Sequence, residues 1–171
     1  MLHIKSKLYR FFPGNTDGDS SMSDLLGGKG ANLAGMARAG FPVAGGITIP
    51  TTMCVDYLQT YKAGNLAPDY LSPQILAETV INMLAEEFEA FSNIPLLSVR
   101  SGAKISMPGM MDTILNVGMS ADNLPHHEKD LGVHTAHECF RRLISMYANV
   151  VHGVPLELFT MVEQKYSTKH G

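Results

Sequence analysis

The chain has 171 residues, of which 45% are hydrophobic and 17% charged, and its net charge is −3 at pH 7. This length and composition predict a soluble globular protein, most simply one domain with a small appended lobe. Binding to nucleic acid or to anionic lipid is not favoured, because both need clustered Lys and Arg, whereas a single nucleotide needs only one or two cations.

The cysteines and the lack of a long apolar segment favour a cytoplasmic location. Cys54 and Cys139 belong to no close pair, which predicts reduced thiols rather than a disulfide framework. The basic N-terminus is followed by turn formers at residues 13–17, where a signal peptide would need an apolar run. No stretch approaches the length of a membrane span. We therefore expect a cytoplasmic protein.

Helices and strands alternate in the first part of the chain. Residues 13–24 are turn formers and predict a loop. A helix is predicted to start among the glycines at 27–30 and to stop at Gly40. A short strand is expected within residues 42–49, and a helix from Thr51 to about Gly64.

The second part of the chain begins with a strong helix signal. Ser72 followed by Pro73 predicts an N-cap and first turn, and an apolar stripe continues to about residue 91. Buried strands are predicted at 95–100 and 113–119, separated by an irregular segment rich in Gly, Pro and Met. Residues 120–132 are polar and predict turns and a lobe boundary. Helices are expected from about His134 to Val151 and after Pro155.

The first candidate binding segment is the run Gly27-Gly28-Lys29-Gly30. Glycines at a helix start let backbone N–H groups approach a phosphate, and the helix dipole favours the anion. Lys29 would add a positive charge. The segment is not a Walker A loop, because Gly30 follows the lysine, and it is not a dinucleotide fingerprint, because Leu33 replaces the third glycine. A solvated lysine beside a flexible turn is an alternative interpretation.

The second candidate is the strand that ends at Arg100, followed by Ser101 and Gly102. A guanidinium fixed at the end of a strand suits bidentate recognition of phosphate oxygens. An arginine in a structural ion pair is the alternative. The third candidate is the loop that contains Met107, Met110 and Met111, whose polarizable side chains offer a surface for a purine ring, although core filling is the commoner use of methionine.

A set of histidines suggests a metal only superficially. His126, His127, His134, His137 and Cys139 have neither the CxxC nor the HExxH spacing of zinc sites. Solvent-facing histidines near a helix N-terminus are the favoured interpretation. No metal ligand is therefore assigned in this chain.

Three segments, LLGGKGANLAGMARAGFPV, LLSVRSGAKISMPGMMDTILNVGM and ECFRRLISMYANVVHGVP, closely resemble the N-terminal nucleotide-binding domain of pyruvate, phosphate dikinases. The resemblance covers nearly the whole chain, from Thr16 to the last helix. It implies an α+β fold: an ATP-grasp-like N-terminal lobe, residues 1–120, with a mixed small sheet and helices, followed by a helical subdomain, residues 121–171. It also implies an N-terminal fragment of a phosphotransferase that uses ATP and Mg²⁺.

Residue roles follow from the same resemblance. Lys29 and Arg100 match the lysine and arginine that act on the ATP phosphates during phosphoryl transfer. The remaining residues implied in nucleotide binding are Gly28, Gly30, Ser101, Met110, Met111 and Thr113.

The sequence also departs from the family pattern. Ala44 and Gly45 stand where the family commonly has two prolines, which loosens that turn, and Ile47 replaces a phenylalanine. The second ATP-grasp lobe with its Mg²⁺ ligands, the phosphohistidine domain and the pyruvate-binding barrel have no match here, and these are the partners that the resemblance implies. The chain alone is expected to be inactive. The alternative hypothesis is a non-catalytic remnant that binds a nucleotide or a partner.

Overall fold

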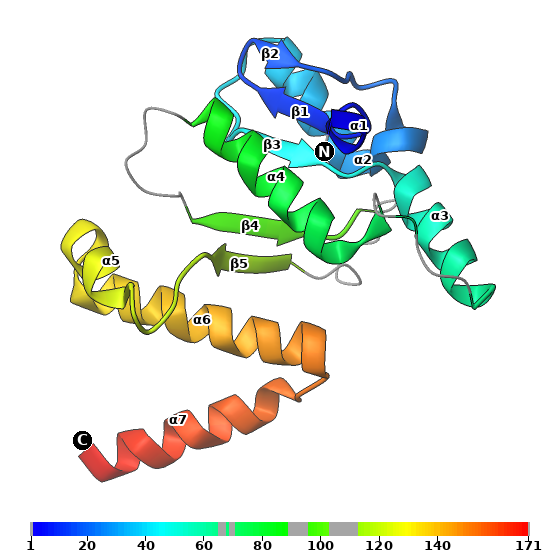
Figure 1. Cartoon of the computed structure of the whole chain (residues 1–171). Helices are drawn as coiled ribbons and strands as arrows, with labels where there is room; N and C mark the ends of the chain where they lie inside the picture. The colour runs from blue at the N-terminus through cyan, green and yellow to red at the C-terminus, as the bar shows by residue number, and fades with distance from the viewer. Residues whose placement is uncertain (1, 65–67, 69–70, 89–95, 103–112, 171) are drawn as a thin grey trace. The chain divides into compact units, whose positions relative to one another are not determined.

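The computed structural model describes residues 2–64, 68, 71–88, 96–102 and 113–170. The chain forms two compact units, Met1–Ser92 with Gly102–Pro108, and Asn93–Ser101 with Gly109–Gly171. Each unit combines helices with short antiparallel strands (Figure 1), which confirms the predicted α+β class. Within the described ranges, every helix is too short or too polar to cross a bilayer.

The first unit is built on a three-stranded antiparallel sheet in the order β2-β1-β3. Its strands are β1 (Tyr9–Phe12), β2 (Asn15–Thr16) and β3 (Gly46–Thr48). The strand β3 confirms the prediction for residues 42–49. The prediction that residues 13–24 form only a loop is wrong, because β2 pairs there with β1 and the helix α2 begins at residue 23. A two-residue strand has no periodicity for a sequence pattern to reveal.

Helix α2 (Ser23–Arg38) packs on this sheet through small residues. Ala31, Ala34 and Ala37 are almost fully buried, so the helix axis can lie close to the strands. The helix ends in a Schellman motif: Gly40 has a φ of 78°, its N–H donates to the carbonyl of Ala37, and the N–H of Phe41 donates to that of Met36. The predicted stop at Gly40 is confirmed.

Three further helices surround the core of the first unit: α1 (Leu2–Lys5), α3 (Thr51–Lys62) and α4 (Pro73–Glu87). The start of α4 at Ser72-Pro73 is as predicted, and its expected extension to residue 91 lies outside the described residues. The buried side chains at the centre come from all three helices and the segments beside them: Ile4, Leu8, Met53, Leu71 and Met83.

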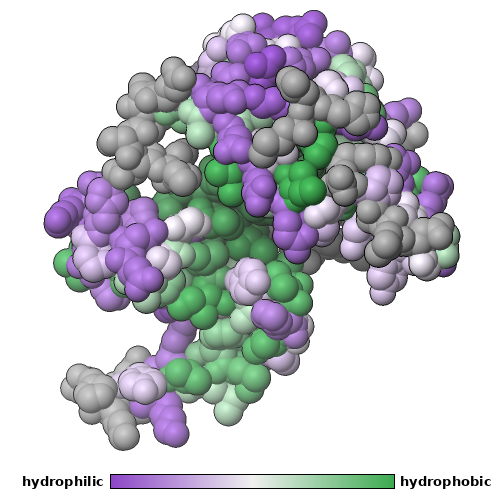
Figure 2. Space-filling view, in the orientation of Figure 1, coloured by the Kyte–Doolittle hydropathy of each residue, from purple (hydrophilic) through white to green (hydrophobic). Residues whose placement is uncertain are grey.

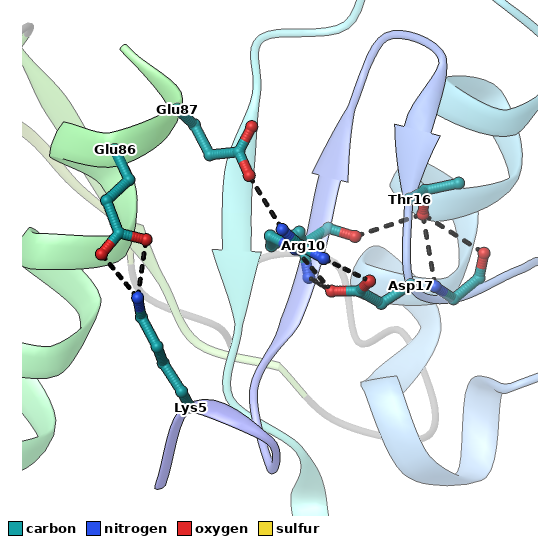
Figure 3. Close-up of polar contacts among 7 residues, drawn as sticks. Lys5, Arg10, Thr16, Asp17, Glu86 and Glu87 are labelled. Atoms are coloured by element: carbon teal, nitrogen blue, oxygen red, sulfur yellow. Dashed lines mark hydrogen bonds and ion pairs between the residues drawn. The ribbon is translucent and has the colours of Figure 1, made fainter. Parts of the chain in front are cut away.

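The end of α4 is attached to the N-terminal segment by three neighbouring contacts. The Lys5 ammonium lies 2.5 Å from Glu86, and Arg10 of β1 donates to Glu87 at 3.1 Å (Figure 3). The next residue, Phe88, meets Phe12 edge to face with ring centroids 5.4 Å apart. The Lys5–Glu86 pair is exposed and therefore weak, whereas the Arg10–Glu87 pair and the aromatic contact are partly buried.

Arg10 also holds the turn after β2 through Asp17. Its backbone N–H and its Nε both donate to Asp17 Oδ2 at 2.9 Å, and its Nη2 donates to Oδ1 at 3.1 Å. These hydrogen bonds from Arg10 lower the pKa of Asp17 below its ordinary value. The carboxylate therefore stabilises the fold at pH values above its unfolded pKa, and this contribution is lost as the pH falls through the lower folded pKa.

We expect Asp17→Asn to lower the free energy of unfolding at pH 7 by about 1–2 kcal/mol, because charged hydrogen bonds are replaced by weaker neutral ones at a partly exposed position. The loss should shrink as the pH falls below about 4, where the wild-type carboxyl becomes protonated. Urea unfolding at several pH values between 7 and 3 measures this. The exposed Asp122→Asn is the control, and a deficit for Asp17→Asn that stays constant with pH would contradict the assignment.

The second unit contains a two-stranded ribbon and three helices: β4 (Leu97–Arg100), β5 (Thr113–Val117), α5 (Leu124–Leu131), α6 (Val133–His152) and α7 (Leu156–His170). Both strands and the two long helices lie where the sequence predicted them. The prediction that residues 95–100 form a buried strand is wrong, because Ser98, Val99 and Arg100 are exposed. The prediction of turns throughout residues 120–132 is wrong, because α5 occupies most of that segment. This helix buries none of its side chains fully, so it has no apolar stripe to reveal it.

Helices α6 and α7 expose a run of apolar side chains, seen as green surface over this part of the chain in Figure 2. The helices are joined at Gly153, whose φ is 67°, and Arg141 of α6 bonds both to Glu138 and to Glu163 of α7. The pairing of Glu138 with Arg141 and Arg142 lowers its pKa to about 2. The exposed apolar residues of these two helices are Val133, Ile144, Tyr147, Val150, Val151, Leu156, Leu158, Met161, Val162 and Tyr166.

Candidate functional site

The glycine–lysine segment lies at a break inside α2. Gly27 has a φ of 69° and a ψ of 164°, so it divides a short first turn, which starts at Ser23, from the longer helical part that starts at Gly28. A residue with a Cβ is strained in that conformation. The break places Gly28, Lys29 and Gly30 in the first turn of the longer part, where N–H groups lack helical acceptors and the dipole is positive. This is the local geometry that the sequence predicted for an anion site.

Gly27 needs to be glycine because of its backbone conformation, whereas Gly30 needs to be glycine because of close packing. A Cβ on Gly30 would lie 2.9 Å from Thr48 Cγ2 and 3.2 Å from Leu26 Cβ. Gly30 is therefore required by the close approach of α2 to β3, and it fixes the start of the helix against the sheet. The hydroxyl of Thr51 donates to the carbonyl of Asp24 at 2.8 Å and attaches the start of α3 to the first turn of α2. Lys29 is half-buried on this framework.

The second group of candidate residues lies on the ribbon of the second unit. Arg100 is the last residue of β4, it is exposed, and it pairs in register with Thr113, the first residue of β5. Cross-strand partners lie on the same face of a ribbon. The resemblance implies that Arg100 and Thr113 both bind the nucleotide, and the structure places them opposite each other. Ser101 follows Arg100 and is also exposed.

One residue that helps to build this ribbon was not singled out in the sequence. Asn116 has a φ of 60°, and its side-chain amide donates to the carbonyl of Cys139 in α6 at 3.0 Å. Asparagine is among the few residues that tolerate positive φ. The signal available in the sequence was therefore an asparagine inside the apolar run Thr113–Val117, followed by Gly118.

Some predicted residues are not located by the structure. Met110 and Met111 lie outside the described residues, so the methionine surface stays a prediction. Lys29 belongs to the first unit and Arg100 to the second.

Two histidines of the set make ion-pair contacts within the second unit. His137 Nε2 lies 2.7 Å from Glu128 Oε1, and His126 Nε2 lies 3.5 Å from Asp130 Oδ2. In the part of the chain that the structure describes, no group of three or more His, Cys, Asp or Glu side chains is arranged to hold a metal ion. The first pair joins α5 to α6 and the second lies within α5, which gives these histidines structural contacts.

Comparison with known proteins identifies relatives over most of the chain. No family model matches. A protein of Flaveria pringlei named pyruvate, phosphate dikinase, chloroplastic, is 42% identical over 159 residues, which are 91% of this chain and 16% of that protein. The pyruvate, phosphate dikinase of Rhizobium meliloti (strain 1021) is 41% identical over 168 residues, 96% of this chain and 18% of that protein. Pyruvate, phosphate dikinase 2 of Oryza sativa subsp. japonica is 40% identical over 160 residues, 91% of this chain and 17% of that protein.

These relatives are phosphotransferases, the enzyme class that the sequence resemblance implied. More particularly, each is named pyruvate, phosphate dikinase, so the chain is homologous to a segment of that enzyme and the resemblance is confirmed. The chain spans 16–18% of the length of the curated relatives cited above.

Proposed function

We propose that this chain holds the phosphates and the adenine of ATP as a segment of a pyruvate, phosphate dikinase. In that enzyme the phosphoryl group passes from ATP to a catalytic histidine elsewhere in the longer protein and serves the interconversion of pyruvate and phosphoenolpyruvate. The observation that carries the proposal is an identity of 40–42% to these dikinases over 91% of the chain. The break at Gly27 and the pairing of Arg100 with Thr113 support it, because both present groups suited to phosphate.

The proposed roles follow from the chemistry of the two segments. The first turn after Gly27 directs backbone N–H groups of Gly28 and Gly30 toward an anion, and Lys29 adds a charge on the same turn. Arg100 binds phosphate oxygens with a planar fork of donors, while the neighbouring hydroxyls of Ser101 and Thr113 complete the polar surface. Lys29 and Arg100 thus position the phosphates and neutralise charge as it develops during transfer. Met110 and Met111 are proposed to contact the adenine.

Magnesium would be supplied with the nucleotide, and it would reduce the negative charge of the phosphates. We propose that its protein ligands lie on the second ATP-grasp lobe that the resemblance implies. We also propose the division into an ATP-grasp-like lobe, residues 1–120, and a helical subdomain, residues 121–171, and a cytoplasmic location. The other domains of the dikinase are the proposed partners.

Titration of the ¹⁵N-labelled chain with ATP·Mg²⁺ tests the proposal. We expect chemical-shift changes at residues 27–32 and at residues 98–102 and 113–114, with saturation in the millimolar range, because an incomplete site binds nucleotides weakly. Adenosine serves as the control for phosphate recognition, and it should leave the signals of residues 27–30 unchanged. If millimolar ATP moved none of these signals, the chain would not be a nucleotide-binding segment.

A further inference from the structure

Asn116 is in an unusual backbone conformation for a strand residue. Its φ of 60° is the only positive φ of a non-glycine residue in the described ranges. Such a conformation carries strain for a residue with a Cβ, and it persists only where the surroundings enforce it. It occurs inside β5, three residues after Thr113, in the strand that pairs with the end of β4.

The conformation coincides with a shift in the pairing of the ribbon. Val99 pairs with Ile114, whereas Leu97, two residues earlier, pairs with Val117, three residues later. One extra residue is therefore accommodated on β5, as in a β-bulge. Because side chains alternate along a strand, the shift lets Ile114 and Val117 lie on the same face, together with Val99 and Leu97.

Without this extra residue, each step of one residue along β4 from Leu97 would be matched by a step of one residue back along β5 from Val117. Arg100 would then face Ile114, and Thr113 would move one residue further, opposite Ser101. The bulge is thus the feature that places a polar side chain, Thr113, opposite Arg100 and keeps the paired apolar residues Val99 and Ile114 on the other face.

The side chain of Asn116 holds the bulge against the neighbouring helix. Its amide Nδ2 donates to the backbone carbonyl of Cys139 at 3.0 Å, in a partly buried contact between β5 and α6. Asparagine satisfies both needs of the position, since it tolerates positive φ and provides a donor that reaches the helix.

We propose that Asn116 is a positioning residue that sets the register of the β4–β5 ribbon and thereby keeps Arg100 opposite Thr113. Its importance for phosphate binding rests on the function proposed above for Arg100. Its effect on the register does not depend on that function. Backbone conformation sets the register, and the bond to Cys139 fixes the bulge on α6.

Three variants separate these contributions. Asn116→Gly keeps access to positive φ but loses the amide, whereas Asn116→Ala loses both. Asn149→Ala is the matched control, because the Asn149 amide also donates to a backbone carbonyl in this unit, that of Val154 at 2.9 Å, at the junction of α6 and α7. NOE spectra across the ribbon report which residues face each other, and ATP and adenosine titrations report binding.

We expect Asn116→Ala to replace the Arg100–Thr113 cross-strand contacts by Arg100–Ile114 contacts and to weaken ATP binding about tenfold, with adenosine binding unchanged. Asn116→Gly and Asn149→Ala should keep the wild-type pairing and bind ATP within about threefold of wild type.

Wild-type pairing in Asn116→Ala would overturn the inference. If that variant does not fold, Asn116→Gly decides, and a changed register in it would also overturn the inference. A wild-type chain that binds no ATP would refute the proposed function alone, because the NOE test of the register does not use nucleotide.

Discussion

Replacing Arg100 by alanine is expected to weaken ATP binding about 10- to 100-fold, the loss that corresponds to a charge-assisted hydrogen-bonded contact with phosphate. Stability should change by less than about 0.5 kcal/mol, because Arg100 is exposed at the end of β4. A loss of ATP affinity without a loss of stability would show that the Arg100 side chain contacts the ligand and does not support the fold. Nucleotide titration followed by NMR, together with urea unfolding of the same variant, provides both measurements.

The control for this prediction is Arg142→Ala. Arg142 is exposed in the same unit, and its removal changes the net charge by the same amount, but it pairs with Glu138 on α6 and lies on no candidate segment. It should leave ATP affinity unchanged within about twofold. Equal losses in the two variants would mean that ATP responds only to the overall charge of the chain. An unchanged affinity in Arg100→Ala would remove Arg100 from the site.

The sequence predicted the helices α3, α4, α6 and α7 and the strands β3, β4 and β5, but it did not predict α5 or β2. The stop of α2 at Gly40 and the start of α4 at Ser72 follow from local backbone chemistry, so the structure reproduces both. Helix α5 was not predicted because its short sequence is mostly polar, and β2 was not predicted because two residues carry no period. Their formation depends on packing against α6 and β1, which the local sequence does not reveal.

The candidate site was predictable in its residue types and not in its backbone. The run of glycines around Lys29 indicated a helix start, but only the structure shows that Gly27 breaks α2 and that Gly30 is required by Thr48. Likewise, the sequence placed Arg100 at the end of a strand and could not predict the bulge at Asn116 that selects its partner. Register depends on contacts between strands, which a pattern along one strand cannot specify.

The turn before β3 departs from the family pattern, and the structure gives a reason for the glycine at position 45. The resemblance expects proline at positions 44 and 45, where this chain has Ala44 and Gly45. A Cβ on Gly45 would lie 2.1 Å from Cδ1 and 2.3 Å from Cε1 of the Phe12 ring. Phe12 is buried, and its ring also contacts Phe88, so it cannot move aside without loss. Glycine at position 45 therefore leaves the space that the Phe12 ring occupies.

We expect Gly45→Ala to lower the free energy of unfolding by about 1–3 kcal/mol, the usual cost of overpacking a filled core. In the background of Phe12→Leu, which removes part of the ring, the same substitution should cost less than about 1 kcal/mol, so the double-mutant cycle should show a large coupling between the two positions. Gly102→Ala is the control, because a Cβ there meets no atom within 4 Å. Urea unfolding measures all four variants. If Gly45→Ala were as harmless as Gly102→Ala, or cost the same with leucine at position 12, the ring of Phe12 would not be the reason for glycine in this turn.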